Sequence, residues 1–286
     1  MARPRRRAGA AWGVFVFGAG KVGRALARAL RKAGVRVKLR AARKGLPRVV
    51  HERVVVLAVR EGQLRALVEA MAARPPMSRA AVVVHVSGAL DDSVLAPLRV
   101  VCAGVAQMHP MISFASKDFS PDVRRGNVLV RGDTAAATKA RAIARALGMT
   151  PRSIGGLDGV AYHAAAGLVA NGAAALAAVG AELLVRAGVA KDVAPKMLGP
   201  LLRSVAENVE TLGFPDALTG PVRRGDAAGV ERHLAALRAK MPSAVDLYVA
   251  SGKAQLPLAR ALGDAPADRF DAVDEVLTFA QNQRQD

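Results

Sequence analysis

The sequence has little cysteine and few aromatic residues. Cys102 is the single cysteine among 286 residues, and Phe, Trp and Tyr together make up 3%. One cysteine excludes an internal disulfide and is typical of a reducing compartment, so we expect a cytoplasmic protein. The apolar run after the basic residues 1–7 contains a glycine turn and continues into a charged segment, which is not the pattern of a secretory signal.

Acidic residues are also scarce. The 23 Asp and Glu residues face 42 Lys and Arg residues, so the net charge is +19. Such a surplus indicates nucleic acid binding where the cations cluster. Only residues 3–7 form a compact basic run, and the aromatic residues are too few for base stacking. We therefore expect no specific nucleic acid partner and attribute the surplus to a general preference for arginine and alanine codons.

Glycine is present at one turn that has a strand before it and a helix after it. Residues 14–17 are apolar, and residues 22–30 repeat apolar side chains with helical period. The glycines between them permit a tight turn, close approach of a pyrophosphate, and close packing of helix on strand. This order predicts a Rossmann-type dinucleotide-binding fold. The candidate cofactor-binding residues here are Gly18, Ala19, Gly20, Lys21, Val22 and Gly23.

Cations follow the second expected strand, residues 35–39. A fold that prefers NAD usually has Asp or Glu at this place, whereas one that prefers NADP has arginine for the 2′-phosphate. Here the chain has Arg40, Arg43 and Lys44 and no acid. These residues predict NADP as the cofactor, with Arg43 as the first choice for the phosphate, although a solvated loop would have the same composition.

The remaining pattern predicts an α/β fold: a doubly wound sheet followed by an all-α C-terminal domain. Ala58 and Val59 end a continuous apolar strand and should line the ribose of the cofactor. Helices are expected at about 62–73 and 134–147. The other strands are expected at 54–59, 82–86, 100–106, 127–131 and 149–154. We place a cofactor domain at 11–156 and a helical substrate and dimerisation domain at 157–286.

Two polar side chains fall at the carboxyl ends of expected strands, where ligands bind in such sheets. Ser87 follows one strand, and His109 follows another in a loop before Pro110. His109 is a candidate acid or base. The alternative is a structural role, in which its side chain forms hydrogen bonds with backbone groups of that loop. His85 lies inside its strand and is expected to be a buried, hydrogen-bonded histidine. No metal site is expected, because these histidines lack the spacing of metal ligands.

A long segment, residues 158–187, is rich in Ala, Gly, Val and Leu. Asn171 interrupts it, and no second apolar span accompanies it, so we expect a buried helix rather than a membrane span. His163, Gly167 and Asn171 are spaced by four and share one helix face, with Tyr162 beside it. Polar groups in such a helix serve either as internal hydrogen-bond anchors or as contacts of a polar ligand.

The C-terminal part reads as further helices. They are expected at 193–212, at 226–240 with Asp226 as N-cap, and from about 243 onward. In the loop before Asp226, Thr219, Arg223 and Arg224 are candidates for contacts with substrate or with a partner subunit. A packing role is an equal alternative. Residues 281–286 look like a frayed tail.

Several stretches together carry a family resemblance. They are Gly18 to Gly23, His85 to Ala89, His109-Pro110 with Phe114, Tyr162 to Ala166 with Asn171, and Ala217 to Asp226. In this order they resemble bacterial proteins with a Rossmann-like domain and a C-terminal helical domain of unassigned function, a family that includes an alternative type of ketopantoate reductase. The resemblance implies an NADP-dependent oxidoreductase.

More remotely, the chain resembles ketopantoate reductases, pyrroline-carboxylate reductases and the 6-phosphogluconate dehydrogenase group. In those proteins the helical domain commonly dimerises, so a homodimer is implied here. Ketopantoate reductases have a catalytic lysine one turn before an asparagine; if Asn171 is that asparagine, Gly167 stands at the lysine position. The run His109-Pro-Met111 is similar to prephenate dehydrogenases, in which a histidine engages the substrate hydroxyl.

The hypothesis is an NADPH-dependent reductase of a small carboxylate that bears a carbonyl or imine, with 2-dehydropantoate as one candidate. The candidate catalytic residues are His109, His163, Ser87 and Asn171, and Ser87 also belongs to the expected cofactor site. Histidine titrates near neutral pH and suits proton delivery, while Ser87 and Asn171 would orient the carbonyl oxygen. Two alternatives stay open: an NADP-dependent dehydrogenase acting oxidatively on a hydroxy or prephenate-like acid, and an NADP(H)-binding sensor or scaffold without chemistry.

Overall fold

The computed structural model describes residues 12–283. The basic run at 3–7, residue 11 and the last three residues of the expected tail lie outside the described residues. The chain divides into two compact units, 1–168 and 169–286. The boundary between the two units falls inside a long helix, whereas we expected it at the glycines near residue 156. The first turns of that helix contact the sheet and therefore belong to the first unit.

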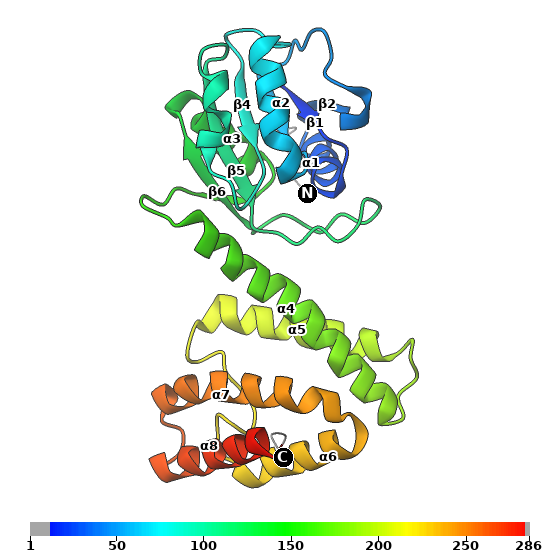
Figure 1. The fold of residues 1–286 in the computed structure, drawn as a ribbon, viewed down its shortest axis with the longest axis vertical. Helices are drawn as coiled ribbons and strands as arrows, with labels where there is room; N and C mark the ends of the chain where they lie inside the picture. The colour runs from blue at the N-terminus through cyan, green and yellow to red at the C-terminus, as the bar shows by residue number, and fades with distance from the viewer. Residues whose placement is uncertain (1–11, 284–286) are drawn as a thin grey trace, which may run out of the picture. The chain divides into compact units, whose positions relative to one another are not determined.

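The first unit contains a seven-stranded sheet with the order β2-β1-β3-β4-β5-β6-β7 (Figure 1). The strands β1 to β5 are parallel to one another, β6 is antiparallel to β5, and β7 is parallel to β6. The strands are β1 (Gly13–Phe17), β2 (Arg36–Arg40), β3 (Val54–Leu57), β4 (Val82–His85), β5 (Gly104–Pro110), β6 (Asn127–Gly132) and β7 (Thr150–Arg152). The predicted doubly wound sheet of the Rossmann type is confirmed.

Helices cover both faces of this sheet because its central strands are apolar on both sides. On one face α1 (Lys21–Lys32) and α3 (Thr134–Ala146) pack on alternate residues such as Val14 and Val16. On the other face α2 (Glu61–Ala73) and the 3-10 segment Asp92–Leu98 pack on Phe15 and Phe17. These helices leave the carboxyl ends of the parallel strands free to carry a site.

Strand β5 differs from the sequence-based prediction. It spans Gly104–Pro110, whereas we expected 100–106 followed by a loop. The polar residues Gln107 and His109 interrupt the apolar run, but they alternate with Met108 and Pro110, which are buried on the opposite face. His109 therefore belongs to the sheet and pairs with Leu129 of β6. The prediction that His109 lies in a loop was wrong. This strand is marked by alternating polar and apolar side chains and not by an unbroken apolar run.

The second unit contains the end of α4 (Gly159–Arg186) together with α5 (Ala194–Leu212), α6 (Ala227–Lys240), α7 (Val245–Leu262) and α8 (Ala267–Asn282). A core around Leu234, Val249 and Leu277 joins α6, α7 and α8. Asp226 caps α6 as predicted, since its carboxylate accepts the Gly229 N–H. The all-α character of the C-terminal part is confirmed.

Helix α4 is not the buried helix that we expected. None of its residues is buried, and Leu168 and Val169 are 77% and 71% exposed. Only Val179 and Leu183 of α4 reach the core of the helical unit, and in α5 only Ala194 is buried. By length and composition α4 would pass as a membrane span, with a mean hydropathy of 1.8, but one such helix is weak evidence for a membrane. Small side chains here mark an uncovered surface of the single chain.

Candidate functional site

The glycine turn after β1 is shaped to receive a pyrophosphate. Gly18 has φ +113°, and a Cβ there would overlap the Ala58 carbonyl oxygen. A Cβ at Gly23 would overlap the Gly18 carbonyl, whereas at Gly20 nothing lies within 4 Å. Helix α1 starts directly after Gly20 with no side-chain cap and no acid in its first turn. Open space therefore lies before uncapped N–H groups, an arrangement that fits the phosphates of a dinucleotide.

The cations after β2 separate into two groups. Arg40 donates from Nε to the Gly45 carbonyl at 2.7 Å and from its terminal nitrogen to the Lys44 carbonyl at 2.6 Å, so it holds its own loop together. Arg43 and Lys44 are exposed in the short 3-10 segment Ala42–Lys44. Arg43 and Lys44 are therefore available to an anion, whereas Arg40 positions the loop that presents them.

The residues after β3 lie beside the glycine turn. Ala58 donates its N–H to the Phe17 carbonyl at 2.8 Å, and its own carbonyl lies against Gly18. Ala58 and Val59 are both half-buried. Their backbone therefore forms one wall of the turn, and their contact with the ribose stays a prediction.

His85 at the end of β4 is fully buried and hydrogen-bonded, as predicted. Its Nε2 donates to the Asp91 carbonyl at 3.0 Å, and its Nδ1 accepts the Ser87 N–H at 3.2 Å. These backbone partners define a neutral ring with the proton on Nε2. Burial lowers the pKa of His85 to about 4, so the ring stays neutral at physiological pH. His85 anchors the turn that carries Ser87 and Gly88.

His109 and His163 meet above Gly88, and we call these two residues the histidine pair. Their ring centroids lie 5.8 Å apart. A Cβ on Gly88 would overlap Nδ1 of His163 and would lie 2.8 Å from Nε2 of His109. The structure therefore brings together two histidines that are far apart in the sequence, on the backbone of a turn that follows β4.

Tyr162 is a third member of this site, from the first turn of α4. Its hydroxyl lies 3.0 Å from Nδ1 of His109, and the two rings are edge-on at 5.5 Å. Burial, together with the neighbouring His163 ring, lowers the pKa of His109 to about 4. Burial also raises the pKa of Tyr162. His109 is thus held as a neutral imidazole beside a protonated phenol, which corrects our expectation that it titrates near neutral pH.

Ser87 is already engaged. Its hydroxyl donates to the carboxylate of Glu61, the first residue of α2, and accepts the Leu90 N–H at 3.3 Å. The same carboxylate accepts the Ala89 N–H at 3.3 Å. In this arrangement the single Ser87 proton is not free for a substrate. Sequence reasoning missed Glu61 because it shows no pattern other than that of an exposed residue at a helix start.

A chain of hydrogen bonds through a buried glutamine connects the parts of this site. Gln107 is fully buried; its amide donates to the Ser87 carbonyl at 2.8 Å and accepts from Nε of Arg131 at 2.6 Å. Arg131 in turn donates to the Leu157 carbonyl at 3.3 Å, just before α4. This chain connects the turn that carries Ser87 and Gly88 to the segment that begins α4. Gln107 and Arg131 become visible as site residues only when β5 and β6 are paired.

Two other candidates belong to the second unit. Asn171 is exposed and belongs to the second unit, outside the first unit that contains the histidine pair. Arg223 pairs with Asp264 at 2.6 Å and donates to the Asp216 and Leu218 carbonyls, so it fastens its own loop. Between residues 12 and 283, no group of three side chains that could hold a metal ion is found.

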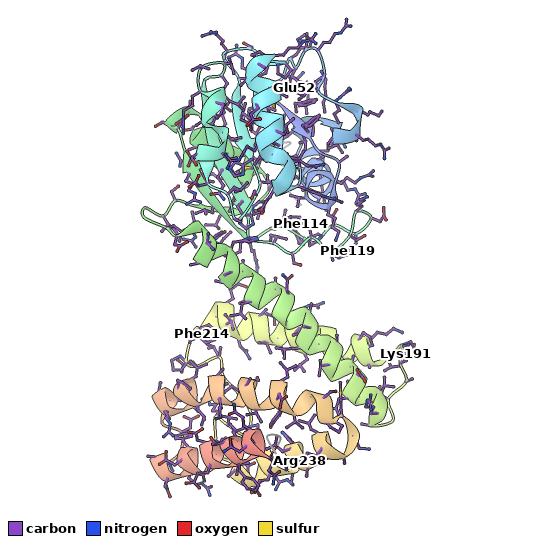
Figure 2. All side chains as sticks on the ribbon, in the orientation of Figure 1. Glu52, Phe114, Phe119, Lys191, Phe214 and Arg238 are labelled. Carbon is purple, nitrogen blue, oxygen red and sulfur yellow. The ribbon has the colours of Figure 1, made fainter. Side chains whose placement is uncertain are left out.

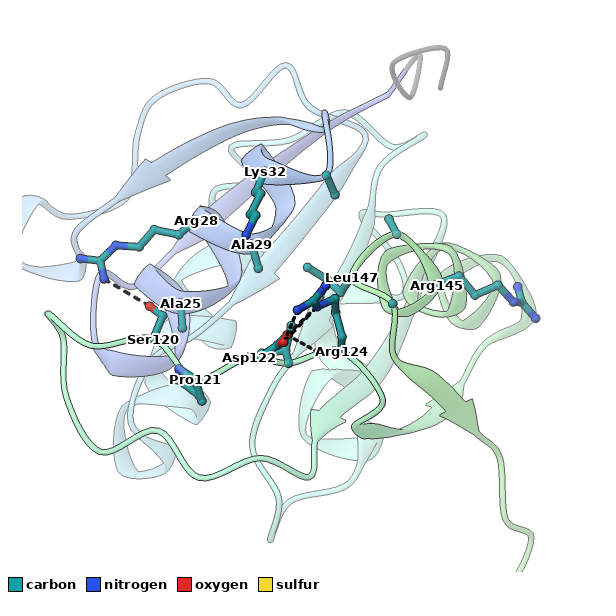
Figure 3. A pocket seen from close by; sticks show the side chains of 14 residues that line it. Ala25, Arg28, Ala29, Lys32, Ser120, Pro121, Asp122, Arg124, Arg145 and Leu147 are labelled. Atoms are coloured by element: carbon teal, nitrogen blue, oxygen red, sulfur yellow. Dashed lines mark hydrogen bonds and ion pairs between the residues drawn. The ribbon is translucent and has the colours of Figure 1, made fainter. Parts of the chain in front are cut away.

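A separate hollow of about 560 Å³ lies between α1, residues 120–124 and the end of α3 (Figure 3). Arg28 bridges it by donating to Ser120 and to the Asp118 carbonyl, and Asp122 and Arg124 pair with each other inside it. It contains none of the candidate site residues. The hollow is therefore separate from the candidate site at the strand ends.

Comparison with known proteins shows which fold this chain shares. Residues 127–255 match the model of a family described as a domain of unknown function (DUF2520). No curated protein matches the chain. The expected resemblance to Rossmann-like proteins with a C-terminal helical domain is confirmed by this match and by solved structures.

Three of these structures cover most of the chain. A protein from Bacteroides fragilis, described as a candidate NADP oxidoreductase (BF3122), is 22% identical with a TM-score of 0.65 and covers 85% of this chain and 97% of its own. Protein TM1727 from Thermotoga maritima is 23% identical with a TM-score of 0.62, over 87% and 98%. Pyrroline carboxylate reductase from Plasmodium falciparum with NADP bound is 13% identical with a TM-score of 0.58, over 95% and 98%. At these identities the likeness shows the fold.

Proposed function

We propose that this protein is an NADPH-dependent reductase of a small carboxylate that bears a carbonyl or imine group. The observation that carries the proposal is the histidine pair above Gly88, at a strand end in the same sheet as the glycine turn. Ligands of doubly wound sheets bind at the carboxyl ends of the strands, so nucleotide and substrate would share this edge. The names of the similar structures, which include an NADP-bound reductase, support this class.

The residues of the chain divide the work. NADPH, when bound, supplies the hydride. The open N–H groups after Gly20 would hold its pyrophosphate, and Arg43 would pair with the 2′-phosphate. The histidine pair would hold the substrate oxygen or nitrogen and supply its proton. The buried chain from Ser87 through Gln107 to Arg131 would keep these side chains in place.

Turnover tests the proposal directly. Purified protein with NADPH and a panel of 2-oxo acids, 2-dehydropantoate and cyclic imines should show loss of NADPH absorbance with at least one substrate. The variant His109→Ala should abolish that turnover while NADPH binding persists. A protein that binds NADPH and reduces no member of the panel would contradict the reductase assignment.

Cofactor preference gives a second and independent prediction. We expect Arg43→Ala to weaken NADPH binding about tenfold or more, because a charge-assisted hydrogen bond to the 2′-phosphate is lost, and to leave NADH binding unchanged. Fluorescence titration measures both constants. Arg48→Ala is the matched control, since Arg48 is an exposed arginine a few residues further on. Equal losses for both cofactors would contradict the role of Arg43.

We further propose that the partner of this chain is a second copy of itself. The uncovered apolar residues of α4 and α5 include Leu176, Leu201 and Val205, and Phe214 directly after α5 is 66% exposed (Figure 2). A soluble protein rarely leaves so many apolar side chains to water. No charged residue stands between His163 and Glu182, so this surface suits close packing against a copy of the same helices.

A further inference from the structure

The molecule contains two pairs of histidine and tyrosine with nearly the same geometry. In the first unit, Nδ1 of His109 lies 3.0 Å from the Tyr162 hydroxyl, with the rings edge-on at 84°. In the second unit, Nδ1 of His233 lies 2.9 Å from the Tyr248 hydroxyl, with the rings edge-on at 82°. Only the first pair stands at the candidate site.

The direction of the first hydrogen bond follows from the chemistry of the two groups. An imidazole nitrogen is a much stronger base than a phenol oxygen, so O–H···N is favoured over N–H···O. The Tyr162 hydroxyl is half-buried, and among residues 12–283 its hydrogen bond is the one to His109. A phenol proton turned away from Nδ1 would lose its partner inside the protein, which costs free energy. The Tyr162 hydroxyl therefore donates, and the proton of the His109 ring sits on Nε2.

Nε2 of His109 faces the space beside Gly88, where the substrate of the proposed reaction would bind. Nε2 is the atom that a Cβ on Gly88 would approach at 2.8 Å, and His163 shares that space. The charged or titratable groups that act on the His109 ring are Glu61, His85 and His163, and Tyr162 is its hydrogen-bond partner. The ring keeps one N–H that points at this space.

We propose that Tyr162 is the positioning residue of the site: it fixes His109 as a neutral donor whose Nε2–H holds the substrate carbonyl or imine. His163, whose ring is exposed to solvent, then carries the transferred proton. During reduction the ring N–H bond of protonated His163 breaks as the O–H or N–H bond of the product forms, and neutral His163 regains a proton from water. This division of roles rests on the proposed reductase function, but the tautomer of His109 does not.

The tautomer is measurable without any substrate or cofactor. Full-length protein labelled with ¹⁵N in its five histidines is followed by long-range ¹H–¹⁵N spectra from pH 8 to pH 5, and His109→Gln assigns the signals. We expect His109 to be neutral with the proton on Nε2 throughout. In Tyr162→Phe we expect both tautomers and easier protonation, because Nδ1 no longer accepts a hydrogen bond.

Tyr248→Phe is the matched control. It removes the same hydroxyl from the other pair, so it should change the His233 signals and leave those of His109 unchanged. With a substrate in hand, Tyr162→Phe should lower kcat about tenfold and change KM by less than about twofold, whereas Tyr248→Phe should change neither. Wild-type His109 with the proton on Nδ1, or an unchanged His109 tautomer in Tyr162→Phe, would overturn the proposal. Absence of any turnover with the expected spectra would overturn only the reductase function.

Discussion

At the scale of single residues, Gly88 shows how a missing side chain makes a site. Both histidines approach the place that a Cβ would occupy, so hydrogen is the only substituent that leaves their rings where they are. The φ of Gly88 is not in the left-handed region, in contrast to Gly18 at +113°. Gly88 is therefore needed for space, whereas Gly18 is needed for both space and conformation.

This distinction gives a prediction for Gly88→Ala. The added methyl group must displace the histidine pair, so we expect turnover to fall at least about tenfold. The free energy of unfolding should drop by only about 1–3 kcal/mol, as for other overpacked sites. Enzyme assays and urea unfolding measure the two effects. Gly155→Ala, where nothing lies within 4 Å of the new Cβ, should change neither; full activity in Gly88→Ala would contradict the site.

At the scale of elements, β4 and β5 each carry one buried or half-buried histidine on the same sheet face. The register pairs His85 with Gln107, so the polar side chains of the two strands lie side by side. Polar groups inside a sheet are tolerated because each has a partner: Asp91 and Ser87 for His85, and Ser87 and Arg131 for Gln107. The polar side chains at these strand ends are thus held by hydrogen bonds.

These strands predict a pH dependence of stability. The pKa of His85 is about 4 in the folded chain and near 6.5 when unfolded. Between these values the unfolded chain binds the proton and the folded chain does not. The contribution is fully present above about pH 6.5 and is lost as pH falls towards 4, by on the order of 3 kcal/mol.

Urea unfolding of the wild type and of His85→Gln at several pH values measures this loss. We expect the variant to show a smaller decrease between pH 6.5 and 4 than the wild type. His51→Gln, at an exposed position, should keep the wild-type slope. Parallel slopes for His85→Gln and the wild type would show that this ring is not the group responsible.

At the scale of the whole molecule, many apolar residues of α4 and α5 are exposed to solvent in the single chain. The core of α6, α7 and α8 takes up only Val179 and Leu183 of α4, and Leu201 in α5 is 57% exposed. A second copy would remove these side chains from water, at about 25 cal/mol for each Å² of apolar surface. The location of the protein in the cell and its freedom from membranes stay predictions.

Light scattering after size-exclusion chromatography tests the second copy. We expect the wild type to have the mass of a dimer in buffer without detergent. Leu201→Glu should shift it to the monomer, because a buried unpaired carboxylate is costly. Ala236→Glu adds the same charge at an exposed position of α6 and should leave the dimer intact. A wild-type monomer, or wild-type protein that sediments with lipid vesicles, would contradict the proposal.

Local patterns in the amino-acid sequence were enough for the elements and the cofactor turn. Apolar patterns and helical period indicated that seven strands and the helices up to α7 exist, although the bounds expected for β5 were wrong. The spacing of Gly18, Gly20 and Gly23 indicated the turn, since each of these features depends on neighbours within a few residues. Asp226 as a cap and His85 as a buried ring followed for the same reason.

The meeting of side chains from distant elements was decided only in the folded chain. The register of β5 puts His109 in the sheet, the entry of α4 puts Tyr162 against it, and α2 puts Glu61 on Ser87. These contacts join residues tens of positions apart, and a shift of one residue in a strand would turn its side chains to the other face. The uncovered surface of α4 is equally non-local, because small apolar residues look the same whether a core, a membrane or a second copy covers them.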